Sequence, residues 1–268
     1  MMSKYQYDLI ESDNYYSIMK AIDKEGNEYT CYQIDRRANE NTTFGKLFRK
    51  YIEIIGSLDH ENIQKYIECV FEEENLGLIV EYQAYSFFAI FKSGKSFDED
   101  SFRPIFVDLM KGIQYLHQNG IAHLDIRPES LFFCKEKKLK ICNFINSEYI
   151  PENGQVSCPY GTNSYQAPEI FCKKPYCAEK ADVWACGILL LSTLIGRNAL
   201  KKGNDQEILQ QISSLSIPKY LSGEVSDLLS KMINIDPSQR IPISKILSHN
   251  WCKSGATFLK SGPNRCFE

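Results

Sequence analysis

The chain has 268 residues and a mass of 30.9 kDa, with 43% hydrophobic and 24% charged residues. This composition is typical of a globular protein of one large domain or two small ones, and it excludes disordered and collagen-like chains. The 31 basic and 34 acidic residues give a net charge of −3, which disfavours a dedicated nucleic-acid binder.

The sequence predicts neither a membrane span nor a secretory signal. The longest mostly apolar stretch, 183–195, has 13 residues, whereas a bilayer span needs about 20. Residues 1–14 are polar and contain no apolar run. The ten cysteines form no Cys-x-x-Cys pair and do not cluster with histidines at zinc-finger spacing. We therefore expect free thiols, a cytoplasmic or nuclear location, and no membrane or nucleic-acid partner.

The first 82 residues predict a small antiparallel sheet with one helix. Short segments rich in aromatic and β-branched residues favour strands, and a turn-forming run at 23–27 joins two of them as a hairpin. Residues 44–58 carry apolar side chains at helical spacing, which indicates an amphipathic helix. The predicted strands cover residues 5–10, 16–22, 29–35, 66–71 and 76–82.

Beyond residue 82 the pattern is mainly helical. An apolar stripe over 102–116 ends at Asn119-Gly120, and two short strands are expected at 130–134 and 138–142. The irregular segment 143–168 is too long for a plain connection and is a candidate functional loop. Later helices are predicted at 181–195, 205–215, 225–234 and 243–247.

These patterns predict an α+β fold of two lobes within one domain. Residues 1–82 form the small antiparallel β lobe with its helix, and residues 83–252 form the large, mainly helical lobe. Residues 253–268 are expected to be a polar tail.

Five motifs follow one another in order. Residues 123–131 read His-Leu-Asp-Ile-Arg-Pro-Glu-Ser-Leu, and residues 161–169 read Gly-Thr-Asn-Ser-Tyr-Gln-Ala-Pro-Glu. Shorter motifs are Leu-Asp-His-Glu-Asn-Ile at 58–63, Asp-Val-Trp-Ala-Cys-Gly at 182–187 and Asp-Pro-Ser-Gln-Arg at 236–240. Together they resemble the catalytic loop, the end of the activation segment and three packing motifs of eukaryotic protein kinases. The resemblance extends from residue 5 to about residue 251 and implies a protein-kinase fold.

The resemblance implies roles for residues that are retained. Asp125 stands at the catalytic base, Arg127 at the phosphate-contacting lysine, and Thr162 at the threonine typical of serine/threonine kinases. The three could instead form a hydrogen-bonded cluster that orders the loop without catalysis, and for Asp125 this is the favoured interpretation. Arg240 is expected to pair with Glu169. The positions expected to support the fold are His123, Phe144, Glu169, Asp182 and Arg240.

The phosphate-binding loop departs from the family. With Ile18 aligned to the valine of the glycine-rich motif, Glu11, Asp13 and Tyr16 replace its three glycines. Glycine suits this loop because only a bare backbone can close over phosphates. Two carboxylates there would repel an anion, by about 4 kcal/mol per charge pair at 4 Å and an effective dielectric of 20, unless they point into solvent.

The lysine–glutamate pair that the resemblance leads us to expect is absent as well. Cys31-Tyr32-Gln33 is aligned with Ala-x-Lys of the third strand, which places Cys31 in the adenine-pocket roof and Gln33 at the lysine. Counting back nine residues from His60 places Tyr51 at the partner glutamate. Joint loss is self-consistent, since neither charge is left buried and unpaired.

The metal and adenine positions are changed as well. Asn143 replaces the aspartate of Asp-Phe-Gly, and Ser130 replaces the asparagine of the catalytic loop. Because Mg²⁺ in such sites is held by carboxylates and phosphates, we expect no metal. Phe132 is expected at the adenine-pocket floor, where an extra ring would fill space, so ATP binding should be weak or absent. Lys20, on the neighbouring strand, is an alternative source of a cation.

Three functions remain open. The leading hypothesis is a pseudokinase, a catalytically impaired kinase-like domain that acts as a scaffold or allosteric regulator of a protein partner, such as an active kinase or its substrate. One alternative is an atypical active serine/threonine kinase, and another is a switch that binds nucleotide without metal. Charge distribution adds a detail: residues 1–82 carry 9 basic and 16 acidic side chains, and the remainder carry 22 and 18.

Overall fold

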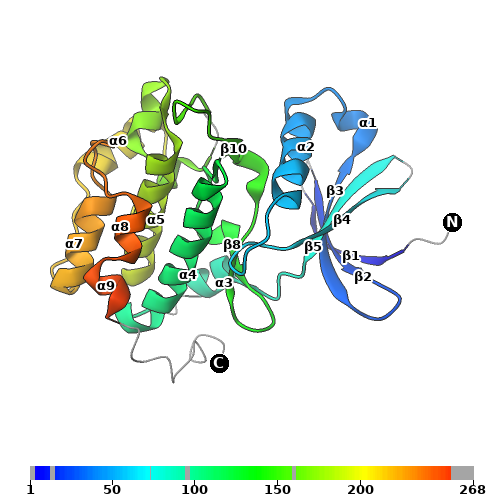
Figure 1. The fold of residues 1–268 in the computed structure, drawn as a ribbon, viewed down its shortest axis with the longest axis horizontal. Coiled ribbons are helices and arrows are strands. Elements are labelled where there is room, and N and C mark those ends of the chain that lie inside the picture. The colour runs from blue at the N-terminus through cyan, green and yellow to red at the C-terminus, as the bar shows by residue number, and fades with distance from the viewer. Residues whose placement is uncertain (1–3, 13–15, 73, 94–96, 159–160, 255–268) are drawn as a thin grey trace.

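The computed structural model describes residues 4–12, 16–72, 74–93, 97–158 and 161–254. Figure 1 shows two lobes side by side, a sheet-containing lobe formed by the N-terminal part and a larger helical lobe formed by the rest. The expected α+β, two-lobed architecture is therefore confirmed. The predicted phosphate-loop residue Asp13 and the predicted polar tail beyond residue 254 lie outside the described residues.

The small lobe is a five-stranded antiparallel sheet in the order β1-β2-β3-β5-β4. One helix of 14 residues packs against it, and the Thr42 side chain caps that helix by accepting the Gly45 N–H at 2.9 Å. All five predicted strands and the predicted helix are present. Their bounds are β1 Gln6–Ser12, β2 Ser17–Ile22, β3 Glu28–Asp35, α1 Arg36–Asn39, α2 Thr43–Gly56, β4 Tyr66–Glu72 and β5 Asn75–Glu81.

The two faces of this sheet bury different side chains. On the outer face, Cys31 packs with Met19, Ala21 and Ile79 in a small cluster. On the inner face, Tyr32 and Ile34 join the main core together with residues of α2. This division follows from the period of two along a strand, because successive side chains point to opposite faces.

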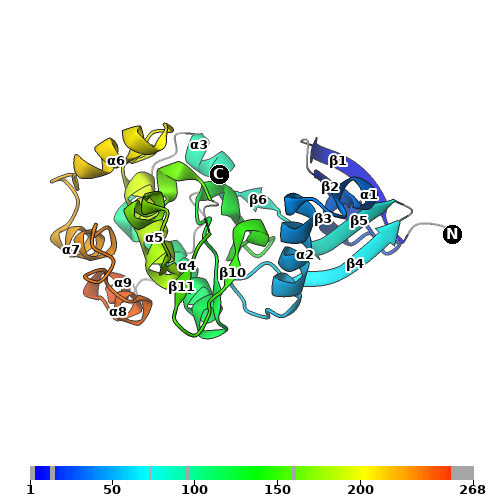
Figure 2. The ribbon, with the colours of Figure 1, turned by 90° about the horizontal axis from the view of Figure 1, so that it is seen from above.

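The large lobe surrounds one helix that is buried over almost its whole length. That helix, α5, occupies the middle of the lobe with α4 beside it, and both views show the remaining helices around this pair (Figures 1 and 2). The predicted helix bounds hold to within a few residues. The helices are α3 Phe87–Lys92, α4 Glu99–Gln118, α5 Ala178–Leu194, α6 Asp205–Ser213, α7 Gly223–Met232, α8 Ile243–Leu247 and α9 Asn250–Lys253.

Short strands hold the connecting loops of the large lobe in place. A three-stranded sheet in the order β6-β8-β9 lies next to the small lobe, and two further pairs, β7 with β10 and β11 with β12, fasten the segment predicted as irregular. The bounds are β6 Tyr85–Ser86, β7 Ile121–Ala122, β8 Leu131–Phe133, β9 Leu139–Ile141, β10 Glu148–Tyr149, β11 Gln155–Val156 and β12 Tyr176–Cys177.

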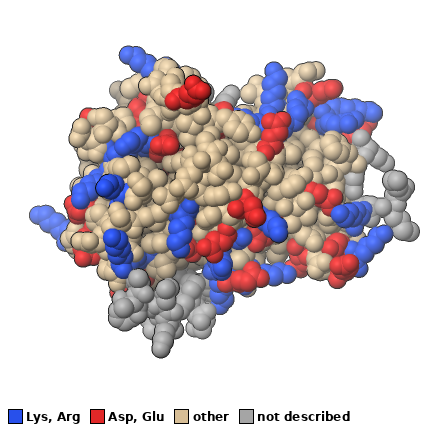
Figure 3. All heavy atoms as spheres, viewed as in Figure 1, with Lys and Arg blue, Asp and Glu red and all other residues tan. Residues whose placement is uncertain are grey.

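Three observations bear on the broad class of protein. Among the described residues, no helix is both long and apolar enough to cross a bilayer. The nine cysteines in that part of the chain are free thiols. On the face shown in Figure 3, basic and acidic side chains are interspersed over both lobes, without a large area of one sign.

Candidate functional site

Asp125 lies in the loop between β7 and β8 and is held by three groups. Its Oδ1 accepts the Thr162 backbone N–H at 3.1 Å and the Thr162 hydroxyl at 3.0 Å, while Oδ2 accepts the Asn146 amide at 3.1 Å. The Arg127 Nε is 3.6 Å from Oδ1 and offsets the negative charge. The Asp125 side chain is only 3% exposed, so these contacts fix its position. Sequence-predicted Asp125, Arg127 and Thr162 are thus in one cluster.

A close backbone approach makes this cluster possible. Gly161 has φ +117°, and a Cβ at that position would lie 2.7 Å from the Leu124 carbonyl oxygen. A side chain there would push Thr162 away from Asp125, so glycine is required. Leu124 itself adopts a left-handed conformation with φ 61°, which costs roughly 1–2 kcal/mol for a non-glycine residue.

Asp182, on the buried helix α5, provides the compensating contacts. Its carboxylate accepts the backbone N–H groups of His123 at 2.9 Å and of Leu124 at 2.8 Å, and lies 2.9 Å from the His117 Nε2. The Asp182 side chain is fully buried. A buried acceptor on a rigid helix therefore anchors the loop that carries Asp125.

His123 is held as a neutral imidazole. Its Nε2 donates to the Cys142 carbonyl at 2.9 Å, and its Nδ1 accepts the Asp125 backbone N–H at 3.3 Å. Complete burial lowers the pKa of His123. The Phe144 ring packs 5.0 Å from the imidazole, centre to centre, which links the catalytic-loop region to the segment after β9.

The expected pair of Glu169 and Arg240 joins two segments of the large lobe. Arg240 Nη1 and Nη2 donate to Glu169 Oε1 and Oε2 at 2.7 and 3.0 Å, a bidentate contact. The same guanidinium donates to the carbonyls of Lys180 and Asn234 and lies 5.1 Å from the Trp184 ring. Arg240 is 1% exposed, and its donors are all engaged with Glu169 and with the carbonyls of Lys180 and Asn234.

The two predicted metal positions, Ser130 and Asn143, differ in their surroundings. The buried Ser130 hydroxyl donates to the Arg127 carbonyl at 2.8 Å and accepts the Arg127 N–H at 3.0 Å, so it closes a turn of its own loop. Asn143 is half-buried and left-handed, with φ 63° and ψ 62°, a conformation that asparagine tolerates. Within the described ranges, no three His, Cys, Asp or Glu side chains come together as a metal site.

The structure corrects the alignment of β3. The sequence prediction placed Cys31 and Gln33 at the inner face, but Cys31 lies in the outer cluster, and Gln33 shares its face. Tyr32 instead points inward, and its ring centre is 6.0 Å from that of Tyr51. Tyr32 therefore holds the position opposite Tyr51 that was predicted for Gln33. Thr30, two residues before Tyr32, lies on the same inner face in the position that was predicted for Cys31.

Tyr32 and Tyr51 belong to a continuous aromatic file that runs from the small lobe to the catalytic loop. Successive ring centres are separated by 6.1, 6.0, 6.0 and 5.0 Å. Burial raises the pKa of Tyr32 and of Tyr51 well above 10, so both hydroxyls stay neutral. The file consists of Tyr16, Tyr32, Tyr51, Phe144 and His123.

The segment that joins the lobes is bonded to the same strand. The Gln83 backbone N–H donates to the Thr30 hydroxyl at 3.1 Å, and the Gln83 side-chain amide donates to the Tyr32 hydroxyl. Thr30 is 1% exposed. Thr30, Tyr32 and Gln83 were not predicted from the sequence. The period of two along the strand offered a signal for the first two, since polar Gln33 between apolar neighbours belongs on the less buried face.

Phe132 lies on β8, where protein atoms cover it. It packs with Cys134 and Cys142 and is 1% exposed. Burial raises the pKa of Cys142 to about 12, so its thiol stays protonated at neutral pH. The side of the site expected to receive an adenine is therefore apolar and enclosed.

Of the predicted phosphate-loop residues, the structure describes Glu11 and Tyr16, and these two have different surroundings. Glu11 pairs with Ile18 in the β1–β2 ladder next to a bulge, and it is exposed, which corresponds to the solvent-facing alternative. Tyr16 stacks on Phe44 with ring centres 6.0 Å apart. Lys20 pairs with Glu28, which also contacts the Lys135 Nζ at 2.9 Å.

Comparison with known proteins agrees with this architecture. Residues 12–252 match the family described as protein kinase domain. The chain is 28% identical over 222 residues to the serine/threonine protein kinase OSK3 of Oryza sativa subsp. indica, covering 81% of this chain and 44% of that protein. It is 32% identical over 210 residues to CBL-interacting protein kinase 11 of Oryza sativa subsp. japonica, covering 76% and 42%.

A third relative is the carbon catabolite-derepressing protein kinase of Secale cereale, 28% identical over 209 residues, covering 77% of this chain and 41% of that protein. The chain thus spans less than half the length of these relatives. The family match covers both lobes and all five motifs. This chain belongs to the protein kinase family.

Proposed function

We propose that this chain is a pseudokinase, which binds a protein partner such as an active kinase or its substrate and does not transfer phosphoryl groups efficiently. The observation that carries the proposal is the buried contact of Tyr32 with Tyr51. Two neutral rings stand where the family resemblance leads us to expect a lysine and its glutamate. Catalysis of phosphoryl transfer depends almost entirely on positioning and charge stabilisation, and this pair supplies no cation.

The potential metal ligands support the same proposal. Ser130 uses its hydroxyl within its own loop, and Asn143 offers a neutral amide in place of a carboxylate. Mg²⁺ in nucleotide sites is held by one or two carboxylates together with phosphates. These residues do not fit such an ion, and we derive no step that passes through one.

The nucleotide side of the interlobe region is also occupied by the protein's own contacts. The Gln83 N–H is taken by Thr30, and the Gln83 amide is taken by Tyr32. Phe132 and Cys142 are covered by neighbouring side chains. A nucleotide would have to break these contacts to bind, so we propose that its affinity is weak or absent.

An active serine/threonine kinase is the second candidate. It is favoured by the ordered cluster of Asp125, Thr162 and Arg127, and by the relatives, which are serine/threonine kinases. Two relatives are named CBL-interacting protein kinases, which supports a protein as the class of partner. The cluster explains loop order equally well, because every contact of Asp125 is made within the chain.

A radiolabel assay distinguishes the two candidates. It measures transfer of the ATP γ-phosphate to the chain itself and to a mixture of serine- and threonine-containing peptides. The proposal predicts incorporation no greater than that of Asp125→Asn. Incorporation well above that control would establish an active kinase and refute the pseudokinase. Calorimetry with ATP in EDTA provides a further arm, since metal-independent binding without transfer would assign a nucleotide-sensing switch instead.

A further inference from the structure

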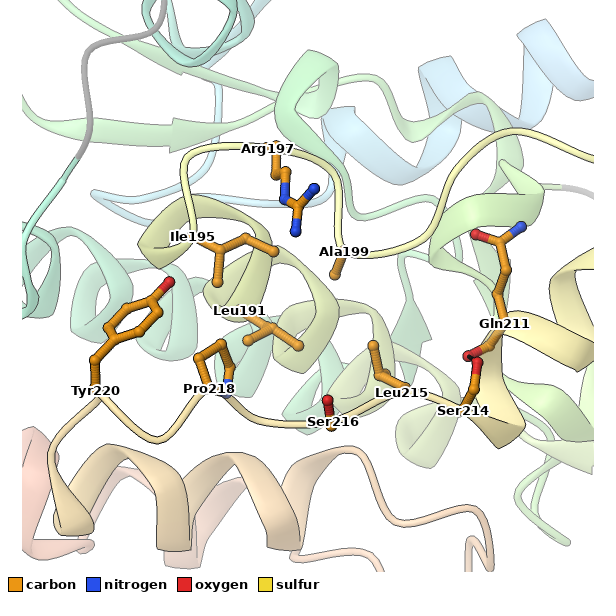
Figure 4. A pocket seen from close by; sticks show the side chains of 10 residues that line it. All are labelled: Leu191, Ile195, Arg197, Ala199, Gln211, Ser214, Leu215, Ser216, Pro218 and Tyr220. Carbon is orange, nitrogen blue, oxygen red and sulfur yellow. Dashed lines mark hydrogen bonds between the residues drawn. The ribbon is translucent and has the colours of Figure 1, made fainter.

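A cavity of about 430 Å³ lies in the large lobe, where the C-terminal end of α5 meets residues 214–220. This volume is within the range of pockets that accept a small ligand or a large side chain. Leu191 and Ile195 of α5 line one side, and Leu215 and Pro218 line the other (Figure 4). The cavity therefore has apolar walls on two sides, and polar side chains, among them Gln211 and Ser216, complete its lining.

Hydrogen bonds fasten the loop that borders this cavity. The Arg197 N–H donates to the Ser192 carbonyl at 3.1 Å, and the Ala199 N–H donates to the Ser192 hydroxyl at 3.0 Å. Further along, Gln211 of α6 accepts the Lys201 N–H at 2.7 Å and donates to the Lys201 carbonyl at 3.3 Å. The loop is thus joined to both α5 and α6, so the cavity is formed before any ligand arrives.

The rim of the cavity is basic and aromatic. Figure 4 shows the Arg197 side chain extending from its loop toward the cavity, with Tyr220 at the opposite edge. Tyr220 is 72% exposed. Throughout the part of the chain that the structure describes, the side chains of four exposed cations on the two segments that border the cavity have no ion pair or hydrogen bond. They are Arg197, Lys201, Lys202 and Lys219.

The two nearest acidic residues along the chain make contacts of their own. Asp205 Oδ1 accepts the Asn163 amide at 3.4 Å, and Glu207 accepts the Asn204 N–H at 2.9 Å as part of the cap of α6. These two carboxylates keep their negative charge, but they face four cations on the segments that border the cavity, so positive charge is in excess there. This agrees with the sequence, in which residues 83–268 carry 22 basic and 18 acidic side chains.

We propose that this cavity docks an acidic segment of a partner protein. One apolar or aromatic side chain of the segment enters the cavity, and carboxylates on either side of it face Arg197 and the adjacent lysines. Arginine and tyrosine are the residue types most often found at the energetic centre of interfaces, and arginine holds carboxylates in a bidentate manner. The surface goes beyond the proposed loss of phosphoryl transfer and does not depend on it, since the Tyr32–Tyr51 region does not line the cavity.

Peptide arrays test the proposal on the full chain. Each peptide has a central residue that varies through all twenty amino acids, with flanks of glutamate, serine or lysine. We expect retention of glutamate-flanked peptides with a central phenylalanine, leucine or tryptophan, and binding is then measured by fluorescence anisotropy without nucleotide. Retention of lysine- or serine-flanked peptides in preference, or of none, would overturn the proposal.

Two exposed substitutions locate the binding on this surface. Arg197→Glu should weaken binding of the best peptide at least about tenfold, because it replaces a charge-assisted contact with repulsion. Tyr220→Ala should weaken it about threefold or more through lost apolar contact. Lys245→Glu on α8 makes the same charge change elsewhere and should leave binding within about twofold.

The same variants exclude other occupants. Equal affinity of wild type and Arg197→Glu would refute docking at this cavity. Self-association in sedimentation that disappears in Arg197→Glu, without peptide binding, would assign the surface to a second copy of the chain and also refute the proposal. None of these experiments measures phosphoryl transfer. A negative result for peptide docking would therefore leave the pseudokinase proposal untouched, and the reverse also holds.

Discussion

The two tyrosines that face each other in the small lobe, Tyr32 of β3 and Tyr51 of α2, should respond in opposite ways to loss of a hydroxyl group. The Tyr51 side chain is 2% exposed, and its hydroxyl lies near the Asn143 backbone and Tyr32 without meeting either in hydrogen-bond geometry. The Tyr32 hydroxyl, by contrast, accepts a hydrogen bond from the Gln83 amide.

A buried polar group without a partner costs about 1–3 kcal/mol, whereas a typical hydrogen bond contributes about 0.5–1.5 kcal/mol. Tyr51→Phe should therefore raise the free energy of unfolding by about 1 kcal/mol, because the ring contacts remain while an unsatisfied hydroxyl is removed. Tyr32→Phe should lower it by about 1 kcal/mol, since the Gln83 amide loses its acceptor.

Urea unfolding at pH 7.5 measures both changes, with equal m-values as the check that only stability has changed. For a protein of this size, each kcal/mol corresponds to a shift in Tm of about 2–4 °C. Destabilisation by Tyr51→Phe equal to that by Tyr32→Phe would refute the reasoning, because it would mean that the Tyr51 hydroxyl makes a bond that the structure lacks.

Three further predictions concern the supporting contacts. Arg240→Met should lower the free energy of unfolding, measured in urea, by about 3–5 kcal/mol, because it leaves Glu169 unpaired. Glu169→Gln should lower it by less, since Arg240 keeps its backbone acceptors. Equal losses for the two variants would contradict this account. Thr162→Val removes one hydrogen bond to Asp125 and should lower the free energy of unfolding by about 1 kcal/mol in the same measurement. An unchanged free energy of unfolding would mean that this contact is absent. Burial lowers the pKa of His123 in the folded chain. As the pH falls, His123 is therefore protonated in the unfolded chain at a higher pH than in the folded chain. The free energy of unfolding should decline below about pH 6.5, by up to about 1.4 kcal/mol per pH unit. His123→Phe should show a shallower decline in the same pH series, and parallel curves would exclude His123 as the cause.

The overall fold could be predicted from the sequence because its signals are periodic and redundant. The apolar stripe of 102–116 and the mostly apolar stretch of 183–195 specify helices α4 and α5. The motifs at 161–169 and 236–240 indicate which segments pair through Glu169 and Arg240. Each of these features depends on many residues, so an error at one of them does not change the result.

The register of β3 could not be fixed in the same way. Its alignment required an alanine and a lysine that this chain lacks, so nothing anchored Cys31-Tyr32-Gln33 to the motif. A shift of one residue moves every side chain to the opposite face of the sheet, and this placed Cys31 and Gln33 inward in error. The contacts of Gln83 with Thr30 and Tyr32 depend on that register. They also join residues that are 53 and 51 positions apart in the sequence, so no local pattern could reveal them.

The most direct test of the pseudokinase proposal is the Tm of the chain with millimolar ATP and Mg²⁺, measured with and without EDTA. A ligand present at a hundred times its Kd stabilises a protein by about 2.7 kcal/mol, which corresponds to a rise in Tm of several degrees. We predict that the Tm stays nearly unchanged under both conditions. A rise of several degrees that EDTA abolishes would contradict the proposal, because it would show that the interlobe region binds the metal–nucleotide complex.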